Sequence, residues 1–378
     1  MTPSVAERVA LITRNTAEVL GADELPALLT GAAPLRHYIG FEISGRVHLG
    51  GGLLTMGKVR DLMEAGVDCS VFLADWHTWI NDKLGGDRTV IRRIATGYFA
   101  EAMRAALTCV GGDPARLRVT LASEFYDRTP DYWATVIEVA KHTSLARMQR
   151  SISILGRGEG DTVDFAKLVY PAMQAADIFA QGVTIAHAGL DQRKAHVIAR
   201  DVAQSLRIAP LRDGSGRTLK PVAVHHPLIL GLAKPAEWPV PPERQRELLS
   251  TQKMSKSKAG SAVFLDDTPD DIRRKVGRAF CPPGDEPLNP VLNWVEHLVF
   301  GLGDTELRVE RTEAHGGPMT LATHAEVVAA HTSGALHPMD LKAALADRLI
   351  DRLAPARERL GTPQMTAMRA EVEGLTAS

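Results

Sequence analysis

Cysteine is scarce in this 378-residue chain: Cys69, Cys109 and Cys281 are the only three, and they lie far apart. An odd number of cysteines without a CxxC pair argues against a disulfide framework and against a zinc site, so we expect no protein-held metal. Reduced cysteines suit a reducing compartment, and the sequence therefore favours a cytoplasmic protein.

Long apolar runs are also missing, and none approaches the ~20 residues that a membrane-spanning helix needs, so we expect no membrane association. The first residues place acidic side chains on a helical pattern, which is not how a signal peptide begins. There is no basic surplus either, because the formal net charge is −1. Proteins that bind nucleic acids usually carry such a surplus, so any contact with RNA must come from local basic patches.

Apolar runs and helical patterns alternate between residues 36 and 230. Short apolar runs that indicate buried strands occupy residues 37–42, 69–74, 117–121, 183–188 and 222–225. Helical patterns occupy residues 49–65, 88–107, 129–155, 171–181 and 191–206. This alternation predicts an α/β fold with a doubly wound parallel sheet, in which ligands bind at the carboxyl ends of the strands where the strand order reverses.

The length of the chain favours two domains. We expect residues 1–34 to form short helices packed on an α/β domain of residues 35–267, and residues 268–378 to form a separate, mostly α-helical domain. Residues 232–252 are rich in proline, glutamate and arginine, which predicts a mobile surface loop. After residue 268 no strand alternation returns, and helices are expected near 269–279, 290–300, 321–331 and 338–353.

The first segment with chemical character is His48-Leu49-Gly50-Gly51-Gly52, which follows the first strand and opens a helix. Glycines there let backbone N–H groups approach a phosphate, and the amino end of the helix adds partial positive charge. An imidazole can donate a hydrogen bond to phosphate oxygens whose charge grows during a displacement. Because the motif is short, a glycine-rich turn with a solvent-exposed histidine is the alternative.

The second segment is Lys253-Met254-Ser255-Lys256-Ser257, after the polar loop. Two lysines on a flexible segment beside small hydroxyl residues suit a lid that closes over a polyphosphate and stabilises the departing pyrophosphate. A solvated basic loop is the alternative. A given pentapeptide arises by chance in a chain of this length only about once in ten thousand cases, so this segment is the stronger signal.

Together, the HLG turn and the later KMSKS segment resemble the signature pair of class I aminoacyl-tRNA synthetases. The resemblance implies a Rossmann-type catalytic domain, ATP as a substrate with Mg²⁺, and attack of an amino-acid carboxylate on the α-phosphorus of ATP. It implies catalytic roles for His48, Lys253 and Lys256. It implies ATP contacts for Gly40, His48, Gly50, Gly51, Lys253, Met254, Ser255, Lys256 and Ser257. Gly51 stands where the family usually has a second histidine, so one imidazole donor is missing.

Three further stretches resemble the tyrosine pocket of archaeal and eukaryotic tyrosyl-tRNA synthetases: residues 38–42 (YIGFE), 170–177 (YPAMQAAD) and 189–194 (GLDQRK). The resemblance extends over nearly the whole chain and implies a homodimer. It implies that Tyr38 and Asp177 bind the phenolic hydroxyl of the substrate. It also implies that Tyr170, Gln174 and Gln192 hold the α-ammonium group of the substrate.

The helical pattern supports these roles independently, because Tyr170, Gln174 and Asp177 fall at positions i, i+4 and i+7 and so share one helix face. Polar groups that face an apolar sheet cost about 1–3 kcal/mol each unless a ligand pairs with them. A solvated outer face is the alternative.

Tryptophan is the nearest competing substrate, but an indole has one N–H donor and no acceptor. His77 could line the pocket, although a structural role is commoner for a lone histidine.

Residues 335–342 (ALHPMDLK) open a helix in the predicted C-terminal domain, and Pro338 and Asp340 suit its first turn. A well-capped helix is the simplest reading. The octet also resembles the anticodon-reading element of archaeal-type tyrosyl-tRNA synthetases. That resemblance implies that Asp340 accepts hydrogen bonds from a guanine of the tRNA(Tyr) anticodon and that His337 stacks nearby.

Three other residues are candidate tRNA contacts by resemblance. His315 stands where relatives carry an aromatic stacking residue, and an imidazole can still stack. Arg193 and Lys194 resemble the contact with the first base pair of the acceptor stem. These positions would supply local basic and stacking groups for RNA, although the chain as a whole has no basic surplus.

The resemblance as a whole implies an ATP-dependent ligase that activates tyrosine as an adenylate and transfers it to tRNA(Tyr). Two alternatives stay open. A non-catalytic RNA-binding paralogue is favoured by Gly51 and by the unusual loop of residues 232–252, while the pair Lys253 and Lys256 argues against it. A paralogue that activates tyrosine or a ring-modified tyrosine outside translation is the other alternative, and the HPMDLK element argues against that.

Overall fold

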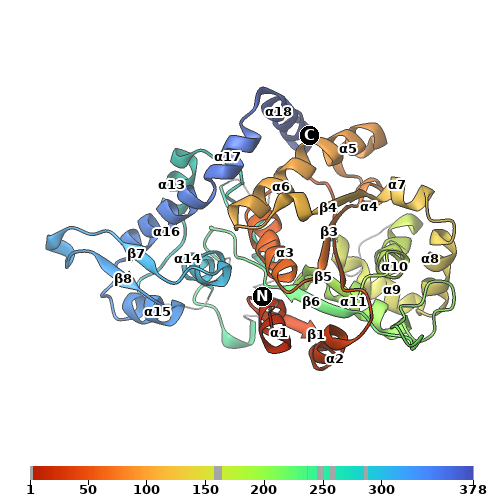
Figure 1. The fold of residues 1–378 in the computed structure, drawn as a ribbon. Helices are drawn as coiled ribbons and strands as arrows, with labels where there is room; N and C mark the ends of the chain where they lie inside the picture. The colour runs from red at the N-terminus through yellow and green to blue at the C-terminus, as the bar shows by residue number, and fades with distance from the viewer. Residues whose placement is uncertain are drawn as a thin grey trace.

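The computed structural model describes residues 3–156, 164–235, 237–244, 248, 251–255, 260–284 and 288–377. Six strands in this part of the chain form one sheet (Figure 1). In spatial order they are β1 (Glu18–Leu20), β6 (Val222–His226), β5 (Ile185–Gly189), β2 (Arg36–Phe41), β3 (Asp68–Leu73) and β4 (Arg118–Leu121). All neighbouring pairs are parallel except β1 and β6, so the predicted parallel α/β sheet is confirmed and carries one antiparallel edge strand.

Strand β1 corrects the expectation that the first 34 residues form only helices. Its residues pair antiparallel to β6, with Glu18 opposite His225. Three residues are too few to show an alternating pattern, so pairing with β6 determines this strand more than local sequence does. The helices on either side of it are α1 (Val5–Thr13) and α2 (Leu25–Thr30), as expected.

The order of the strands reverses between β2 and β5. From β2 the chain moves outward to β3 and β4, then returns to the other side of β2 and continues through β5 to β6. Tyr38 lies at this junction, paired with Ser70 of β3 on one side and with Ala186 of β5 on the other. A crevice for ligands is therefore expected at the carboxyl ends of β2 and β5.

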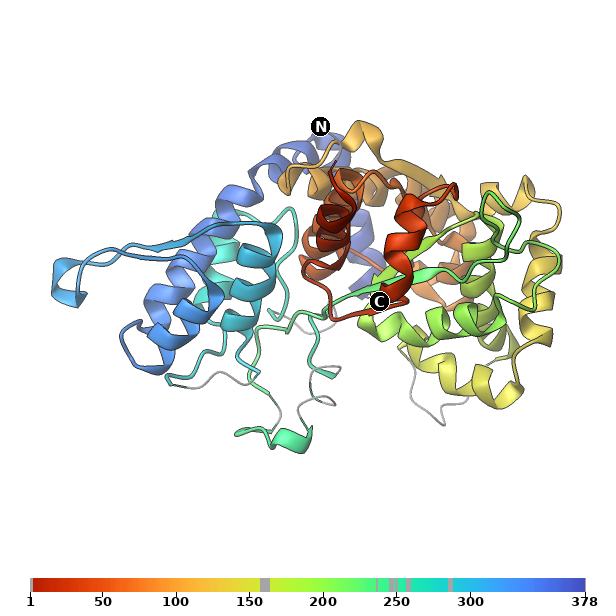
Figure 2. The same ribbon diagram turned by 60° about the horizontal axis from the view of Figure 1, so that its bottom comes forward.

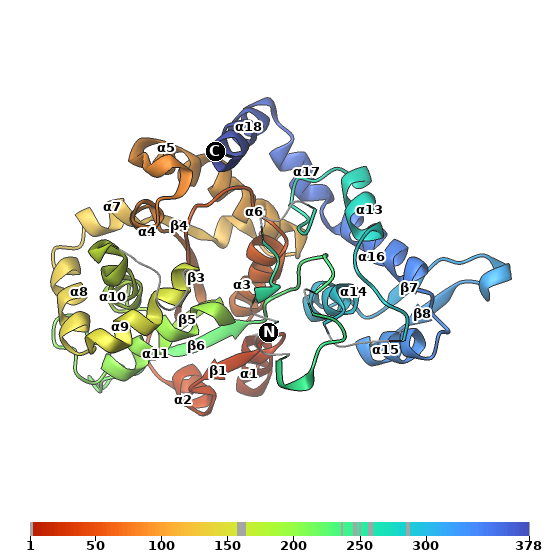
Figure 3. The ribbon, with the colours of Figure 1, turned by 180° about the vertical axis from the view of Figure 1, so that it is seen from behind.

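Helices cover both faces of the sheet (Figure 1, Figure 3). Alternate residues of a strand point to opposite faces, and accordingly Ile39 belongs to one apolar cluster and Tyr38 to another. The face of Ile39 packs against α3 and α6, and the face of Tyr38 packs against α8, α10 and α11. These helices and their neighbours are α3 (Thr55–Glu64), α4 (Asp75–Ile80), α5 (Arg88–Ile94), α6 (Ala100–Cys109), α7 (Ala122–Asp127), α8 (Tyr132–Lys141), α9 (Leu145–Ser151), α10 (Phe165–Ala180) and α11 (Arg193–Val202).

Helix α10 begins at Phe165, six residues before the start predicted at residue 171. The Asp164 side chain accepts a hydrogen bond from the Lys167 N–H and so caps the helix. Pro171 therefore lies inside the helix and not in its first turn. The earlier start places Tyr170 in regular helix, on the face predicted for it.

The C-terminal part of the chain contains a hairpin that the sequence did not reveal. Strands β7 (Leu307–Val309) and β8 (Met319–Leu321) pair antiparallel, and the hairpin projects from the molecule (Figure 2). The expectation that no strand follows residue 268 was wrong, because strands of three residues leave no measurable periodicity. The remaining elements there are α13 (Pro269–Gly277), α14 (Pro290–Trp294), α15 (His324–Thr332), α16 (Pro338–Arg352), α17 (Ala354–Leu360) and α18 (Pro363–Ala377).

The last two helices return to the α/β part, where α17 packs on α6 and α18 lies near α5 (Figure 1). A methyl group added at Gly97, between α5 and α6, would lie 2.2 Å from the Met368 Cε atom of α18, so this contact is tight.

The domain boundaries at residues 34 and 267 stay predictions, as does the mobility of residues 232–252. Among the described residues, no helix has both the length and the apolar character that a membrane crossing requires.

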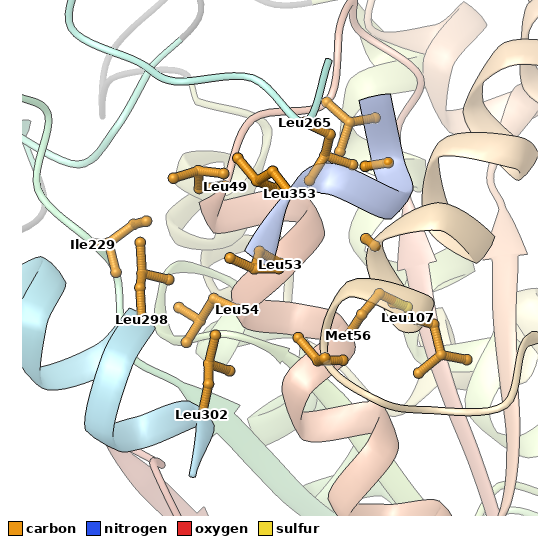
Figure 4. Close-up of a cluster of buried hydrophobic side chains, with 14 of the residues drawn as sticks. Leu49, Leu53, Leu54, Met56, Leu107, Ile229, Leu265, Leu298, Leu302 and Leu353 are labelled. Carbon is orange, nitrogen blue, oxygen red and sulfur yellow. The ribbon is translucent and has the colours of Figure 1, made fainter. Parts of the chain in front are cut away.

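The glycine turn after β2 is anchored in the largest apolar cluster of the described chain (Figure 4). Leu49 and Leu53 of this turn share that cluster with Leu298 and Leu353, which lie beyond residue 268. The turn itself is a π-helical segment, Gly50–Leu54, that continues into α3. Buried leucines on both sides of the expected domain boundary therefore fix the position of the turn.

Candidate active site

A cavity of about 1150 Å³ opens at the carboxyl ends of β2 and β5, in the predicted crevice. Every residue predicted to contact tyrosine or ATP lines it, wherever the structure describes that residue: Tyr38, Gly40, His48, Gly50, Gly51, Tyr170, Gln174, Asp177, Gln192, Lys253, Met254 and Ser255. Lys256 and Ser257 lie outside the described residues. The volume is large enough for two substrates side by side, since single-ligand pockets usually span roughly 300–1000 Å³.

The deep end of the cavity is built around Asp177, which is 2% exposed. Its Oδ1 atom accepts hydrogen bonds from the hydroxyls of Tyr132 (2.9 Å) and Tyr126 (3.0 Å). Burial raises the pKa of Asp177 to about 7, and the hydrogen bonds from Tyr132 and Tyr126 act in the opposite direction. The Tyr38 hydroxyl, which also lines this end, donates to the main-chain oxygen of Gln174 at 3.3 Å.

His77 also lines the cavity, with its Nε2 atom 3.9 Å from Asp177 Oδ2 and its ring edge-on to Tyr170. Neither ring nitrogen has a hydrogen-bond partner within the described part of the chain, although the residue is buried. Burial lowers the pKa of His77 to about 3, so the ring is neutral. The structure thus places His77 in the cavity wall, where sequence reasoning gave a structural role the better odds.

A second polar group lies one helical turn from Asp177. The Gln174 side chain donates to Gln192 Oε1 at 3.2 Å, and the Gln192 side chain donates to the main-chain oxygen of Ile154 at 3.0 Å. The Gln174 Oε1 atom is buried without a partner in the described chain. An unpaired buried acceptor that lines a cavity calls for a donor from a ligand, and an ammonium group has three.

The glycine turn presents backbone and imidazole donors to the other end of the cavity. The His48 Nδ1 atom lies 3.1 Å from the Gly51 N–H and accepts its hydrogen bond. In a neutral imidazole the proton is then on Nε2, so His48 can act as a donor from that atom. This is the polarity that contact with a phosphate oxygen requires.

Lys253 faces the same end of the cavity from the segment after the polar loop. Its Nζ atom pairs with Asp191 Oδ2 at 2.6 Å. Asp191 also lines the cavity but carried no predicted role. The pair is more than a third exposed on the lysine side, so its contribution to stability is small and its main effect is on where Lys253 lies.

The C-terminal helix α18 reaches this cavity as well, a contribution that the sequence did not predict. Glu373, Leu375 and Thr376 belong to its wall. Glu373 pairs with Arg46 Nη1 at 3.1 Å, and the Arg46 guanidinium lies 4.3 Å from the centre of the Phe264 ring. These contacts hold the end of α18 against the glycine-turn side of the cavity.

The predicted tRNA contacts lie at two separate places. Arg193 and Lys194 are exposed at the start of α11, where Arg193 pairs with Glu18. His337 caps α16 by accepting a hydrogen bond from the Met339 N–H. The region of α16, α15 and the β7–β8 hairpin stands at the end of the molecule opposite α8 (Figure 1, Figure 3).

Asp340 is half-buried in the first turn of α16, and His315 is exposed in a short turn between β7 and β8. Neither residue lines the cavity. Among the described residues, no group of three histidine, cysteine or acidic side chains is arranged to hold a metal ion. The cavity residues and the distant C-terminal residues would therefore have to serve different parts of one large ligand, or different ligands.

Comparison with known proteins identifies the family of the chain. The model of the family "tRNA synthetases class I (W and Y)" matches residues 30–354. The tyrosine–tRNA ligases of Thermococcus sibiricus and Pyrococcus abyssi are 51% and 50% identical over 356 residues, covering 94% of each chain.

Among solved structures, the tyrosyl-tRNA synthetase from Pyrococcus horikoshii, complexed with L-tyrosine, matches with a TM-score of 0.95 at 48% identity. The match covers 98% of this chain and 100% of that one. The enzyme from Aeropyrum pernix matches with a TM-score of 0.80 at 41% identity, over 98% of this chain and 99% of that one. With its fold and most of its length shared with these proteins, the chain belongs to the class I tRNA synthetases for tryptophan and tyrosine, in the archaeal tyrosyl type.

Proposed function

We propose that this chain activates L-tyrosine with ATP, giving tyrosyl-adenylate and pyrophosphate, and then transfers the tyrosyl group to the 3′ end of tRNA(Tyr). The observation that carries the proposal is one cavity with two ends. One end holds a buried carboxylate and an unpaired amide oxygen, and the other holds the glycine turn and Lys253. The relatives at about half identity are tyrosine–tRNA ligases, which supports the same choice of amino acid.

The amino acid would lie with its ring toward Asp177. A phenol can donate its O–H to Asp177 and accept from the Tyr38 hydroxyl, whose O–H would turn toward it from the main-chain oxygen of Gln174. The ammonium group would donate to the unpaired Gln174 Oε1 atom, with Tyr170 and Gln192 beside it. Phenylalanine and tryptophan leave this pairing incomplete, and a site built for a hydroxyl rejects a ligand without one.

The nucleotide would lie along the glycine turn. In the reaction the tyrosine carboxylate oxygen forms a bond to the α-phosphorus of ATP, and the bond from that phosphorus to the pyrophosphate oxygen breaks. His48 can donate from Nε2 to a phosphate oxygen, and Lys253 can stabilise the leaving pyrophosphate. Both contributions are electrostatic, so neither residue needs to form a covalent intermediate.

Mg²⁺ is expected to enter with ATP and, when bound, would offset the charge of the phosphates. Mg²⁺ keeps phosphate and water oxygens as most of its ligands and needs only one or two protein carboxylates. The cavity offers Glu42, Asp82 and Asp191 as oxygen donors, which fits this mode of binding. The protein residues then bind and orient the reacting groups.

We also propose that tRNA(Tyr) bridges the two parts of the chain, with its acceptor end at Arg193 and Lys194. Its anticodon would meet Asp340, with His337 and His315 as stacking groups. Such a ligand would span the distance between the cavity and the β7–β8 region, which no small molecule does. We place the reaction in the cytoplasm, where tRNA and ATP are abundant.

We further propose that two copies associate through the surface of α8 and the starts of α9 and α10. Three large apolar side chains there are strongly exposed: Ile137 (60%), Leu145 (63%) and Phe165 (78%). A cluster of this kind on a monomer usually marks an interaction site. Sedimentation of the wild type and of Ile137→Glu tests this, with a dimer expected for the first and a shift toward monomer for the second.

The decisive test is ATP–pyrophosphate exchange with a panel of amino acids, followed by charging of purified tRNA(Tyr). Exchange is expected with tyrosine, weakly or not at all with phenylalanine and tryptophan. A ring-modified tyrosine such as 3-hydroxytyrosine belongs in the panel, because its preference over tyrosine would point to a role outside translation. No exchange with any amino acid would indicate the non-catalytic paralogue instead.

A further inference from the structure

Tyrosine is rare in this chain, which has only five. Four of the five lie around Asp177, and two of these, Tyr126 and Tyr132, are not part of the cavity wall. Tyr126 comes from α7 and Tyr132 from the first turn of α8, and their rings stack at a centroid distance of 3.7 Å. Both side chains are buried behind Asp177, where no resemblance or motif had given them a role.

The two hydroxyls donate to the same oxygen of Asp177. Tyr132 lies 2.9 Å and Tyr126 3.0 Å from Oδ1, and a carboxylate oxygen has two lone-pair directions in its plane. With both directions of Oδ1 occupied, Oδ2 is the oxygen left to accept from a ligand. The rotation of the carboxylate about its Cβ–Cγ bond is also fixed, because two donors from two different helices hold it.

We propose that Tyr126 and Tyr132 are positioning residues for tyrosine recognition: they occupy Oδ1 of Asp177, favour its ionised form, and leave Oδ2 as the acceptor for the phenol O–H. This inference rests on the proposed function of the cavity and assigns its selectivity to a layer of residues behind the wall. Neither tyrosine would touch the substrate. Each would act only through Asp177.

The surroundings of Asp177 explain why two donors are needed. The groups that face it are His77 of α4, Tyr38 of β2, Tyr170 of α10, Tyr126 and Tyr132, and none of them is cationic at neutral pH. A buried carboxylate without a cation nearby is held ionised mainly by hydrogen bonds from neutral donors.

Even with both hydroxyls present, burial raises the pKa of Asp177 to about 7. Removal of one hydroxyl would raise it further, so that more of Asp177 is protonated at neutral pH. A protonated Asp177 competes with the phenol as a donor and offers a weaker acceptor. Tyrosine binding should then weaken at pH 7 and recover as the pH is raised through the new pKa.

The test compares Tyr126→Phe, Tyr132→Phe and the double variant with wild type. Phenylalanine keeps the stacked rings and removes only the hydroxyls, so the packing behind Asp177 is preserved. Tyr98→Phe is the matched control. Tyr98 is the fifth tyrosine, it is equally buried, it belongs to the other apolar cluster, and it does not line the cavity.

The measurement is ATP–pyrophosphate exchange from pH 6 to 9, with KM for tyrosine, KM for ATP and kcat determined separately. We expect KM for tyrosine in the double variant to rise roughly three- to tenfold at pH 7 and to approach the wild-type value at pH 9. KM for ATP should not change. Phenylalanine at high concentration should be activated as in wild type, so the ratio between tyrosine and phenylalanine falls.

Three outcomes would overturn the inference. A wild-type KM for tyrosine at every pH would show that the hydroxyls do not act on recognition. An equal, pH-independent loss for tyrosine and phenylalanine would show that they only maintain packing. Absence of tyrosine activation in the wild-type enzyme would refute the proposed function, and this inference with it. If the double variant shows no cooperative unfolding transition and is therefore not folded, the single variant Tyr126→Phe takes its place. Calorimetric titration of that variant with tyrosine then gives the comparison with wild type.

Discussion

Gly51 and Gly52 are neighbours in the turn after β2, yet a methyl group added to each would meet opposite surroundings. At Gly52 it would lie 2.9 Å from Val47 Cγ1 and 3.0 Å from Leu265 Cδ1, both in the buried core. At Gly51 the nearest atom is His48 Cε1 at 3.7 Å, an ordinary contact beside the cavity. The turn is therefore closely packed at one glycine and open at the next.

This contrast predicts different effects of the same substitution. Gly52→Ala should lower the free energy of unfolding by about 1–3 kcal/mol, because the added methyl overpacks the core. Gly51→Ala should leave it unchanged or slightly higher, since alanine favours a helical backbone. Urea denaturation of the two variants checks this, and equal losses would contradict the assigned packing.

Lys253 is predicted to act on the chemical step. Lys253→Ala should lower kcat of pyrophosphate exchange by about 10²–10³-fold, as expected for loss of one group that stabilises charge in the transition state. KM for tyrosine should stay near its wild-type value, because Lys253 lies at the other end of the cavity. Lys234→Ala, an exposed lysine of the preceding loop, is the control and should have no effect. A large rise in KM for tyrosine with unchanged kcat would assign Lys253 to substrate binding.

Asp177→Asn tests the phenol acceptor itself. The amide oxygen can still accept from Tyr126 and Tyr132, so the pocket should keep its shape while the charge is lost. We expect KM for tyrosine to rise by roughly tenfold or more, as for loss of a charge-assisted hydrogen bond. Asp201→Asn, on the exposed side of α11, is the matched control. Near-unchanged exchange in Asp177→Asn would remove this residue from tyrosine recognition.

Three buried histidines predict how stability depends on pH. His37 of β2, His187 of β5 and His226 of β6 form a hydrogen-bonded row across the sheet, with ring nitrogens 3.1 Å and 2.9 Å apart. Burial lowers the pKa of His37 to about 3 and that of His226 to about 4, and lowers that of His187 as well. All three are therefore neutral in the folded protein at pH 7.

In the unfolded chain each of these histidines titrates near pH 6.5, so the unfolded state binds more protons below that pH. Stability is then fully present above pH 6.5 and falls toward pH 4, by about 1.4 kcal/mol per pH unit for each histidine. Denaturation from pH 7.5 to 4.5 should show a shallower slope for His37→Gln than for wild type. His315→Gln, at an exposed site, should keep the wild-type slope.

Asp340 is predicted to affect only the step that uses RNA. Asp340→Ala should lower kcat/KM for charging tRNA(Tyr) by roughly tenfold or more, the effect of losing a base contact, and leave pyrophosphate exchange unchanged. Asp347→Ala removes an exposed carboxylate from the same helix and serves as the control. A parallel loss in exchange would mean that Asp340 supports the fold instead.

The parallel strands and the cavity wall could be predicted from the sequence for a physical reason. Buried strands such as β5 and β6 appear in the sequence as apolar runs, and several residues that line the cavity follow directly at strand ends or share one helix face. Tyr170, Gln174 and Asp177 needed only helical spacing to be placed together. The match to class I synthetases confirms the fold and family predicted from these motifs.

The rest could not be predicted because it depends on contacts between distant segments. The strands β1, β7 and β8 have three residues each and form only with their partners. Tyr126 and Tyr132 precede Asp177 by a long stretch of chain, and only tertiary structure shows that their hydroxyls converge on one oxygen. The spacing between such residues carries no regular period that a pattern search could detect.

The position of α18 has a consequence for biosynthesis. A ribosome adds residues 373–376 after every other residue of the cavity wall, so a nascent chain lacks this part of the wall until those residues emerge. Premature termination within α18 would leave the wall incomplete. A protein fused close behind residue 376 would emerge beside the glycine-turn side of the cavity, which makes the amino terminus the safer place for an affinity tag.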